Sequence, residues 1–393
     1  MTLTKSLKVE IKRTSWPNNR PPRKLARLAG TQNINITAFL LMIGDCTVPT
    51  HAARHSINAL WAWVRYFGAF SPDADFRLSH DFAELDPHQK TILSDDFGMG
   101  MSLHLIFNAL GLQSFCDGKY FIDRMSTRVR FKAAAKNAKN GARKSPDFVG
   151  WDRFGKFHVI ECKGTQSGAA YSNRQMNLGI TQKCAIRFAQ PNRGQSLVTG
   201  FEIAQAQDAS ESRIVIQDPE PEDPPLDINE DEAGLAVETL ARAKIAKSFM
   251  LAGASNLSRI VAAPFGDDPA NLPDSQLSMS ERERASRLRL AGQDDLLGLS
   301  ASDGFLGREA TFDLPFRIQT KSGTFTKVFV RSEVAEDLVK FWAELLRNDN
   351  PFDDVLGSEQ EGMAKGKIET SSHASGGELQ DGKLFRSRIE FLK

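Results

Sequence analysis

The residues with the strongest potential for chemistry lie between 145 and 165, in the stretch SPDFVGWDRFGKFHVIECKGT. Its second half predicts a β-strand, in which successive side chains point to opposite faces of a sheet. Glu161 and Lys163 therefore share one face, and Cys162 points to the other. Val159 and Ile160 are typical of a buried strand. Two charged side chains on such a strand are costly unless they are paired or bind a metal.

Asp147 opens the preceding strand-like run, PDFVGW. The short turn DRFG, with Asp152 and Gly155, folds the two strands side by side and brings Asp147 to the same edge as Glu161. Two carboxylates and an ammonium group suit a hard divalent cation, Mg²⁺ or Mn²⁺, which prefers oxygen ligands. We expect the metal ligands to be Asp147, Glu161 and the main-chain carbonyl of Cys162.

The chemistry that this arrangement predicts is hydrolysis of a phosphodiester. The metal would polarise the phosphodiester, lower the pKa of a bound water, or both. Lys163 would orient that water or stabilise the charge that builds up on the phosphate, and the sequence leaves open whether it acts as a base. Asp147, Glu161 and Lys163 are thus the expected catalytic residues. The alternative is a degenerate domain in which they only form a salt bridge.

The pattern Pro146-Asp147 … Glu161-Cys162-Lys163 resembles the motif of the PD-(D/E)XK nuclease superfamily, and thirteen residues separate Asp147 from Glu161. The resemblance implies an α/β, restriction-endonuclease-like fold, with a mixed sheet core flanked by helices. The chain offers the matching order of elements: a helix at 98–112, strands through 165, a helix at 174–190, and strands at 196–203 and 213–217. A nuclease core with unfamiliar flanks resembles prokaryotic anti-phage or restriction nucleases.

Many members of the superfamily carry an acidic metal ligand on the first core helix, but the expected helix at 98–112 has no acid. The nearest candidates are Glu84, Asp95 and Asp96, and we name Asp96 as a possible accessory residue. Some members add a Gln or Lys from the second helix. Gln175, Gln182 and Lys183 are available there, and we name Gln182, for which a solvent-facing position is the alternative.

A strongly basic run lies just before Asp147, with no acid between 124 and 144. Its side chains would hold a phosphate backbone without reading sequence, and a solvated helix face is the alternative. The expected nucleic-acid-binding residues are Arg128, Arg130, Lys132, Lys136, Lys139, Arg143 and Lys144. We expect DNA as the substrate, cut by an endonuclease. RNA is one alternative, and a non-catalytic nucleic-acid-binding or assembly subunit is the other.

The composition is that of an ordinary globular chain. The 393 residues are 41% hydrophobic and 25% charged with a net charge of +1, which excludes a disordered chain, a collagen and a disulfide scaffold. Four scattered cysteines with no CxxC pair, no visible signal peptide and no apolar run long enough to span a bilayer predict a cytoplasmic protein without membrane contact. No P-loop motif is present, so a motor would be a separate partner chain, and a homodimer is the other assembly considered.

Shifts in composition predict five regions. They are a basic arm and helical N-terminal region at 1–94, the nuclease core at 95–218, an acidic Pro-rich linker at 219–233, an α+β region at 234–356, and a flexible Gly/Ser-rich tail at 357–393. Within the α+β region, TFDLPFRIQT and TFTKVFVRS predict a hairpin, and the segment 333–347 predicts an amphipathic helix.

Overall fold

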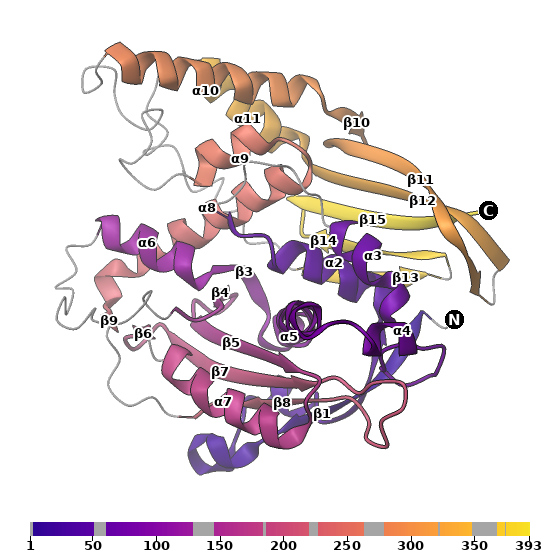
Figure 1. Ribbon diagram of the computed structural model, residues 1–393. Coiled ribbons are helices and arrows are strands. Elements are labelled where there is room, and N and C mark those ends of the chain that lie inside the picture. The colour runs from indigo at the N-terminus through magenta and orange to yellow at the C-terminus, as the bar shows by residue number, and fades with distance from the viewer. Residues whose placement is uncertain are drawn as a thin grey trace.

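The structure of the chain is a computed structural model. It describes residues 3–50, 60–128, 145–183, 186–219, 227–262, 279–320, 323–347, 368–373 and 375–393. These residues form a mixed α/β protein with two large sheets flanked by helices (Figure 1). One continuous hydrophobic core includes side chains from both sheets, such as Ile160 and Val330. No helix in the described ranges is both long enough and apolar enough to cross a membrane.

A seven-stranded mixed sheet carries the predicted motif. Its strands lie in the order β2-β1-β8-β7-β5-β4-β3. They are β1 (Thr4–Ile11), β2 (Gly30–Asn35), β3 (Leu112–Asp117), β4 (Phe148–Asp152), β5 (Phe157–Thr165), β7 (Arg193–Glu202) and β8 (Arg213–Gln217). β5 is parallel to β7 and β1 is parallel to β8, whereas the other neighbours are antiparallel. The expectation of a mixed sheet flanked by helices is therefore confirmed.

Helix α5 (Pro87–Leu110) packs against β5 on one face of this sheet. Its N-cap Asp86 accepts hydrogen bonds from the main-chain N–H groups of His88 and Gln89, at 2.9 and 3.2 Å. Pro87 follows in the first turn, where a main-chain N–H would have no acceptor within the helix, so its absence costs no hydrogen bond. The helix ends at Gly111, which adopts the left-handed conformation with φ of 69°. The helix is thus longer than the expected 98–112 and begins well before it.

Two glycines let α5 approach β5 closely. A Cβ atom on Gly164 would lie 1.7 Å from the carbonyl oxygen of Ser94, and one on Gly98 would lie 2.7 Å from the main-chain nitrogen of Gly164. Any larger side chain at the crossing would separate helix and strand, so these glycines fix the position of α5 beside the motif.

Helix α7 (Ala169–Lys183) covers β5 and β7 from the other face (Figure 1). It links these two parallel strands as a crossover helix. Further helices are α1 (Arg23–Ala26), α2 (Ile36–Cys46), α3 (Leu60–Tyr66), α4 (His80–Ala83), α6 (Gly118–Arg128), α8 (Ala233–Leu251), α9 (Ser255–Ala262), α10 (Met279–Leu297) and α11 (Glu336–Arg347). Short 3-10 turns are η1 (Arg13–Ser15), η2 (Pro17–Asn19), η4 (Phe67–Ala69) and η5 (Glu230–Glu232).

The second sheet is antiparallel, with its strands in the order β10-β11-β12-β15-β14-β13. They are β10 (Ser300–Ser302), β11 (Phe305–Thr320), β12 (Gly323–Ala335), β13 (Ile368–His373), β14 (Gly376–Asp381) and β15 (Phe385–Leu392). The predicted hairpin corresponds to β11 and β12, and the predicted amphipathic helix to α11. A separate pair of short parallel strands is β6 (Arg187–Phe188) with β9 (Asp227–Ile228).

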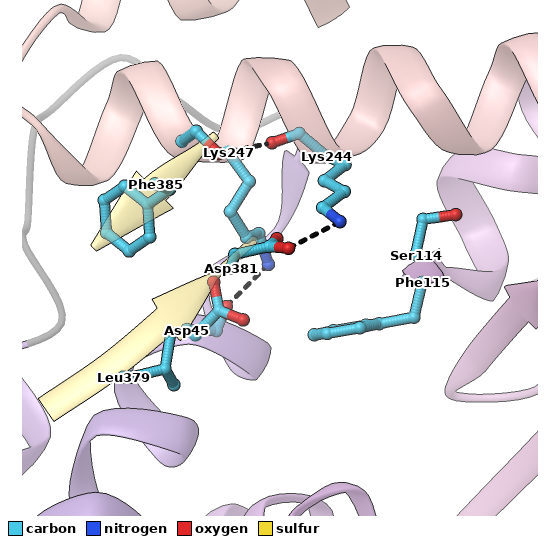
Figure 2. Close-up of a pocket in the computed structure, with 9 residues that line it drawn as sticks. Asp45, Ser114, Phe115, Lys244, Lys247, Leu379, Asp381 and Phe385 are labelled. Carbon is cyan, nitrogen blue, oxygen red and sulfur yellow. Dashed lines mark hydrogen bonds and ion pairs between the residues drawn. The ribbon is translucent and has the colours of Figure 1, made fainter. Parts of the chain in front are cut away.

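Helix α8 joins the two sheets, because it contacts β3 of the first and β12 of the second. Lys244 Nζ on α8 lies 2.6 Å from Asp381 Oδ1 at the end of β14. Lys247 Nζ donates a hydrogen bond of 2.7 Å to the main-chain oxygen of Asp45 on α2. These four residues line a small buried pocket together with β3 (Figure 2). The contact between the two sheets therefore contains buried charges as well as apolar side chains.

The expected basic N-terminal arm is wrong, because residues 4–35 contribute two strands to the large sheet. β1 lies between β2 and β8, with Leu7, Val9 and Ile11 buried at alternate positions. Lys5 is fully buried, and its ammonium group donates to the main-chain oxygens of Ser71, at 2.6 Å, and of Asp73. The core at 95–218 is therefore not a self-contained sheet.

The expected flexible tail is also wrong over its second half. Residues 368–373 and 375–393 form β13, β14 and β15, with Phe385, Ile389 and Phe391 buried. Part of the expected acidic linker, residues 220–226, lies outside the described residues. The rest of it leads through η5 into α8, which contacts both sheets, so the region from 234 onward is not a separate unit.

Candidate active site

The β4–β5 hairpin places Asp147 beside Glu161. Phe148 pairs with Ile160 in the antiparallel ladder, and one step further Asp147 and Glu161 are opposite each other. The turn is fixed by Asp152, whose Oδ1 accepts hydrogen bonds from the main-chain N–H groups of Phe154 at 2.8 Å and Lys156 at 2.9 Å. The register of the hairpin therefore follows from its turn, as the sequence predicts.

Hydrogen bonds connect the three predicted catalytic residues. Asp147 Oδ2 accepts a hydrogen bond of 2.7 Å from the main-chain nitrogen of Cys162. The main-chain nitrogen of Asp147 donates to Glu161 Oε2 at 3.2 Å. Lys163 Nζ lies 2.5 Å from Glu161 Oε1. The structure thus brings Asp147, Glu161 and Lys163 together at the open end of the hairpin.

Neighbouring residues of β5 point to opposite faces. Glu161 and Lys163 face α7, since a Cβ atom on Gly179 of α7 would lie 3.1 Å from Glu161 Cγ and 3.5 Å from Lys163 Cε. The Cys162 thiol faces α5 and interacts with Ser102 on that helix. In an extended strand the N–H and C=O of one residue point to the same side. The Cys162 carbonyl therefore faces the same edge as Asp147, which is the side required of a main-chain metal ligand.

With both of its acids ionised, the site has one more negative charge than positive charge. The Glu161 side chain is 0% exposed, and the Lys163 side chain is 21% exposed. Burial raises the pKa of Asp147 to about 6 and that of Glu161 to about 8, and the proximity of Asp147 adds to the shift of Glu161. Burial lowers the pKa of Lys163, but attraction to Glu161 and Asp147 outweighs it, so the net pKa is raised. Two carboxylates share one lysine, and a bound cation would balance the remaining charge.

The first core helix contributes a third acid to this region, but it is not Asp96. Asp96 accepts a hydrogen bond from the hydroxyl of Tyr66, in a buried position. Asp95, one turn before Gly98, is close enough to Lys163 and Asp147 to affect their electrostatics. Burial raises the pKa of Asp95, and Lys163 opposes this shift. Asp95, rather than the expected accessory Asp96, is therefore the acid of α5 that interacts electrostatically with Asp147 and Lys163.

Helix α7 offers a polar side chain above the site. Gln182 belongs to α7, but its side chain lies outside the described residues. Gln175 lies one turn before Gly179 and is half-buried, and its Oε1 has no hydrogen-bond partner among the described residues. The sequence offered Gln175 as one of several glutamine and lysine candidates on this helix. Gly179 packs against Glu161 and Lys163, and Gln175 lies one turn before it, so Gln175 is on the side of the helix toward the site.

The expected nucleic-acid-binding residues fall almost entirely outside the described part of the chain. Arg128 ends α6, and its side chain is not described. The others lie outside the described residues: Arg130, Lys132, Lys136, Lys139, Arg143 and Lys144. Their contact with nucleic acid stays a prediction.

No three His, Cys, Asp or Glu side chains gather as a metal-binding group in the part of the chain that the structure describes. The candidate ligands at the hairpin are two carboxylates and one main-chain carbonyl. This set has only two side-chain ligands, so it does not form a group of three such side chains. Comparisons of the chain with protein families, with curated proteins and with solved structures find no match.

Proposed function

We propose that this chain is a divalent-metal-dependent nuclease of the PD-(D/E)XK type that hydrolyses phosphodiester bonds, with DNA as its substrate. The observation that carries the proposal is the hydrogen-bonded group of Asp147, Glu161 and Lys163 at the open end of the β4–β5 hairpin. A buried pair of carboxylates with raised pKa values and one lysine is the kind of arrangement that marks a functional site.

The order of the elements supports the same proposal. Helix α5, strands β3, β4 and β5, helix α7 and strand β7 follow one another along the chain. This is the order that the resemblance implies for a restriction-endonuclease-like core, which consists of a helix, a mixed sheet carrying the motif, a second helix and further strands. Helix α7 is the second helix of this order, and it joins the motif strand β5 to the parallel strand β7.

The residues present fit Mg²⁺ or Mn²⁺. Mg²⁺ takes oxygen ligands and is bound in many proteins by only one or two carboxylates, with water completing the shell. Asp147, Glu161 and the Cys162 carbonyl would hold it, with Asp95 near enough to bind through water. When bound, the ion supplies Lewis-acid polarisation of the phosphodiester and a more acidic water.

Lys163 acts on the reacting phosphate. Its ammonium group has three protons, and Glu161 Oε1 accepts one of them. The remaining protons are available to a phosphate oxygen on which charge builds up, or to the attacking water. Because Lys163 is partly exposed and held by Glu161, its charge is oriented before the substrate arrives.

The test is incubation of the purified chain with supercoiled plasmid, linear duplex, single-stranded DNA and RNA, with Mg²⁺ or Mn²⁺ and with EDTA. We expect cleavage that requires the cation and is lost in Glu161→Gln and Lys163→Ala. Cleavage that persists in both variants would refute the assignment. Binding of nucleic acid that ignores the cation and the Asp147→Asn change, without cleavage, would favour a non-catalytic subunit.

A further inference from the structure

The two exposed flanks of α7 differ in chemistry. Tyr171 is 42% exposed and Leu178 is 63% exposed, and they lie seven residues apart, two turns along the same side of the helix. Arg174, also exposed, lies between them. The other exposed positions include Asn173 and Asn177, which are polar and uncharged. One flank is therefore apolar and basic, and the other is neutral and polar.

The packing of α7 shows which flank borders the candidate active site. Met176 forms a buried cluster with Val198 of β7 and Val215 of β8, and Ile180 packs against this cluster, so these positions mark the side toward β8. Gly179 faces Glu161 and Lys163 of β5. With 3.6 residues per turn, Asn173 and Asn177 then lie on the β8 side.

The same periodicity places Tyr171 and Leu178 on the opposite side, toward β5 and β4, together with Gln175. The apolar, basic flank thus runs along the edge where Asp147, Glu161 and Lys163 meet. Single exposed apolar side chains are ordinary on protein surfaces. Here, however, an aromatic and an aliphatic side chain are aligned beside a candidate active site, and the helix contains no acid. This arrangement suits a ligand with apolar faces and negative charge.

Unpaired nucleic acid has that chemistry. Every base has an apolar face that stacks on aromatic side chains, and each nucleotide has a phosphate that an arginine can bind. In a duplex the base faces are stacked inside and the surface offers mainly phosphates, for which a row of cations is the usual partner. The flank has one cation and two apolar side chains, so it suits a single strand better than a duplex.

We propose that Tyr171, Arg174 and Leu178 form a binding strip for single-stranded nucleic acid that leads to the candidate active site. Tyr171 stacks on a base, Leu178 contacts a second base about 10 Å further along the helix axis, and Arg174 binds the phosphate backbone. This inference rests on the proposed nuclease function and names the form of its substrate.

The test is equilibrium binding, measured by fluorescence anisotropy, of labelled single-stranded DNA, single-stranded RNA and duplex DNA. The full chain carries Asp147→Asn, so that cleavage does not interfere. Tyr171→Ala should weaken single-strand binding about 5- to 100-fold, the range expected when one base–aromatic stack is lost. Tyr171→Trp should retain binding, because it retains the stacking surface. Asn177→Ala, at an exposed position on the other flank of the same helix, is the matched control.

Duplex binding should change little in all three variants. Equal single-strand affinity of Tyr171→Ala and Asn177→Ala, with unchanged melting temperatures, would overturn the strip. The two proposals fail in different ways. Single-strand binding that depends on Tyr171, in a wild-type chain that cuts nothing, would leave the strip standing and refute the nuclease. Suppose instead that Tyr171→Ala still cleaves single strands in a cation-dependent way with an unchanged KM. This result would refute the strip and leave the nuclease proposal standing.

Discussion

Asp147 and Cys162 are joined across the open end of the β4–β5 hairpin by a side-chain-to-main-chain hydrogen bond of 2.7 Å. The carboxylate of Asp147 occupies the place of a strand carbonyl, because β4 begins only at Phe148. The strand β5 continues to Thr165 without a β4 partner beyond Ile160. A rigid main-chain donor therefore orients the acid, next to the part of β5 that has no β4 partner.

We expect Asp147→Asn to abolish cleavage without destabilising the chain. Burial disfavours two carboxylates near one ammonium group, and the amide leaves Glu161 and Lys163 as a balanced pair while its oxygen still accepts from Cys162. Activity should fall at least 100-fold. The free energy of unfolding in EDTA, from urea titration, should stay equal or rise by about 1 kcal/mol.

Lys163→Ala is the contrasting variant, because it leaves two buried carboxylates without their ammonium partner. It should lose activity and also stability. A loss of stability in Asp147→Asn as large as that in Lys163→Ala would contradict this account of the charge balance.

Asp95 and Asp96 should separate into a metal-related and a structural role. Asp95→Ala removes an acid that interacts electrostatically with Lys163 and Asp147, so the Mg²⁺ concentration needed for half-maximal cleavage should rise about tenfold or more. Asp96→Ala removes the partner of the buried Tyr66 hydroxyl, which costs about 1–3 kcal/mol of stability. Tyr66→Phe serves as a control for the same hydrogen bond. If only Asp96→Ala changed the Mg²⁺ requirement, then Asp96 and not Asp95 would have the metal-related role.

Gly164→Ala should damage both stability and activity. The new Cβ would lie 1.7 Å from the carbonyl oxygen of Ser94, so α5 must move away from β5 and from the motif. We expect a loss of at least about 1–3 kcal/mol in urea denaturation, the usual cost of overpacking. The control is Gly234→Ala at the start of α8, where a Cβ meets no atom within 4 Å and alanine should be neutral or stabilising. Similar effects at the two positions would refute the close contact of α5 with β5.

The buried pair of Lys244 and Asp381 should show strong coupling in a double-mutant cycle. Either single change, Lys244→Met or Asp381→Leu, leaves a buried charge without its partner and should cost about 3–5 kcal/mol. The double variant should lose much less than the sum of the two singles. Additive losses measured by urea denaturation would show that the ion pair contributes nothing to the contact between the sheets.

The pH dependence of stability should also report on Asp381. Burial raises its pKa from 3.8 to about 6, although Lys244 opposes the shift. The folded chain therefore binds the proton more tightly than the unfolded chain, so this contribution to stability is present below pH 4 and is lost as the pH rises through 6. Asp45, Lys244 and Lys247 face the same pocket (Figure 2).

Relative to Asp381→Asn, the wild type should become less stable between pH 4 and pH 6, by at most about 3 kcal/mol. Urea titrations of both proteins across this range measure the difference. An opposite slope would show that attraction to Lys244 dominates over burial.

The sequence by itself determined the local part of the site. Alternation along β5 put Glu161 and Lys163 on one face, and the turn at Asp152 set the register that brings Asp147 to them. Both depend only on contacts between residues close in the chain, which leave a readable pattern. The hairpin of β11 and β12 and the amphipathic helix α11 were predictable for the same reason.

Tertiary structure decided what depends on distant partners. The alternation of Leu7, Val9 and Ile11 was present in the sequence, but the lysines and arginines around them indicated a solvated arm until β2 and β8 provided the flanking strands. The Gly/Ser-rich end of the chain becomes β13, β14 and β15 because β12 provides an edge to pair with. Asp95 and Asp96 are adjacent and chemically identical, so only the packing of α5, fixed at Gly98 and Gly164, determines which of them is buried against Tyr66. Long-range contacts of this kind produce no regular spacing of residues in the sequence, because the fold determines which distant residue becomes the partner.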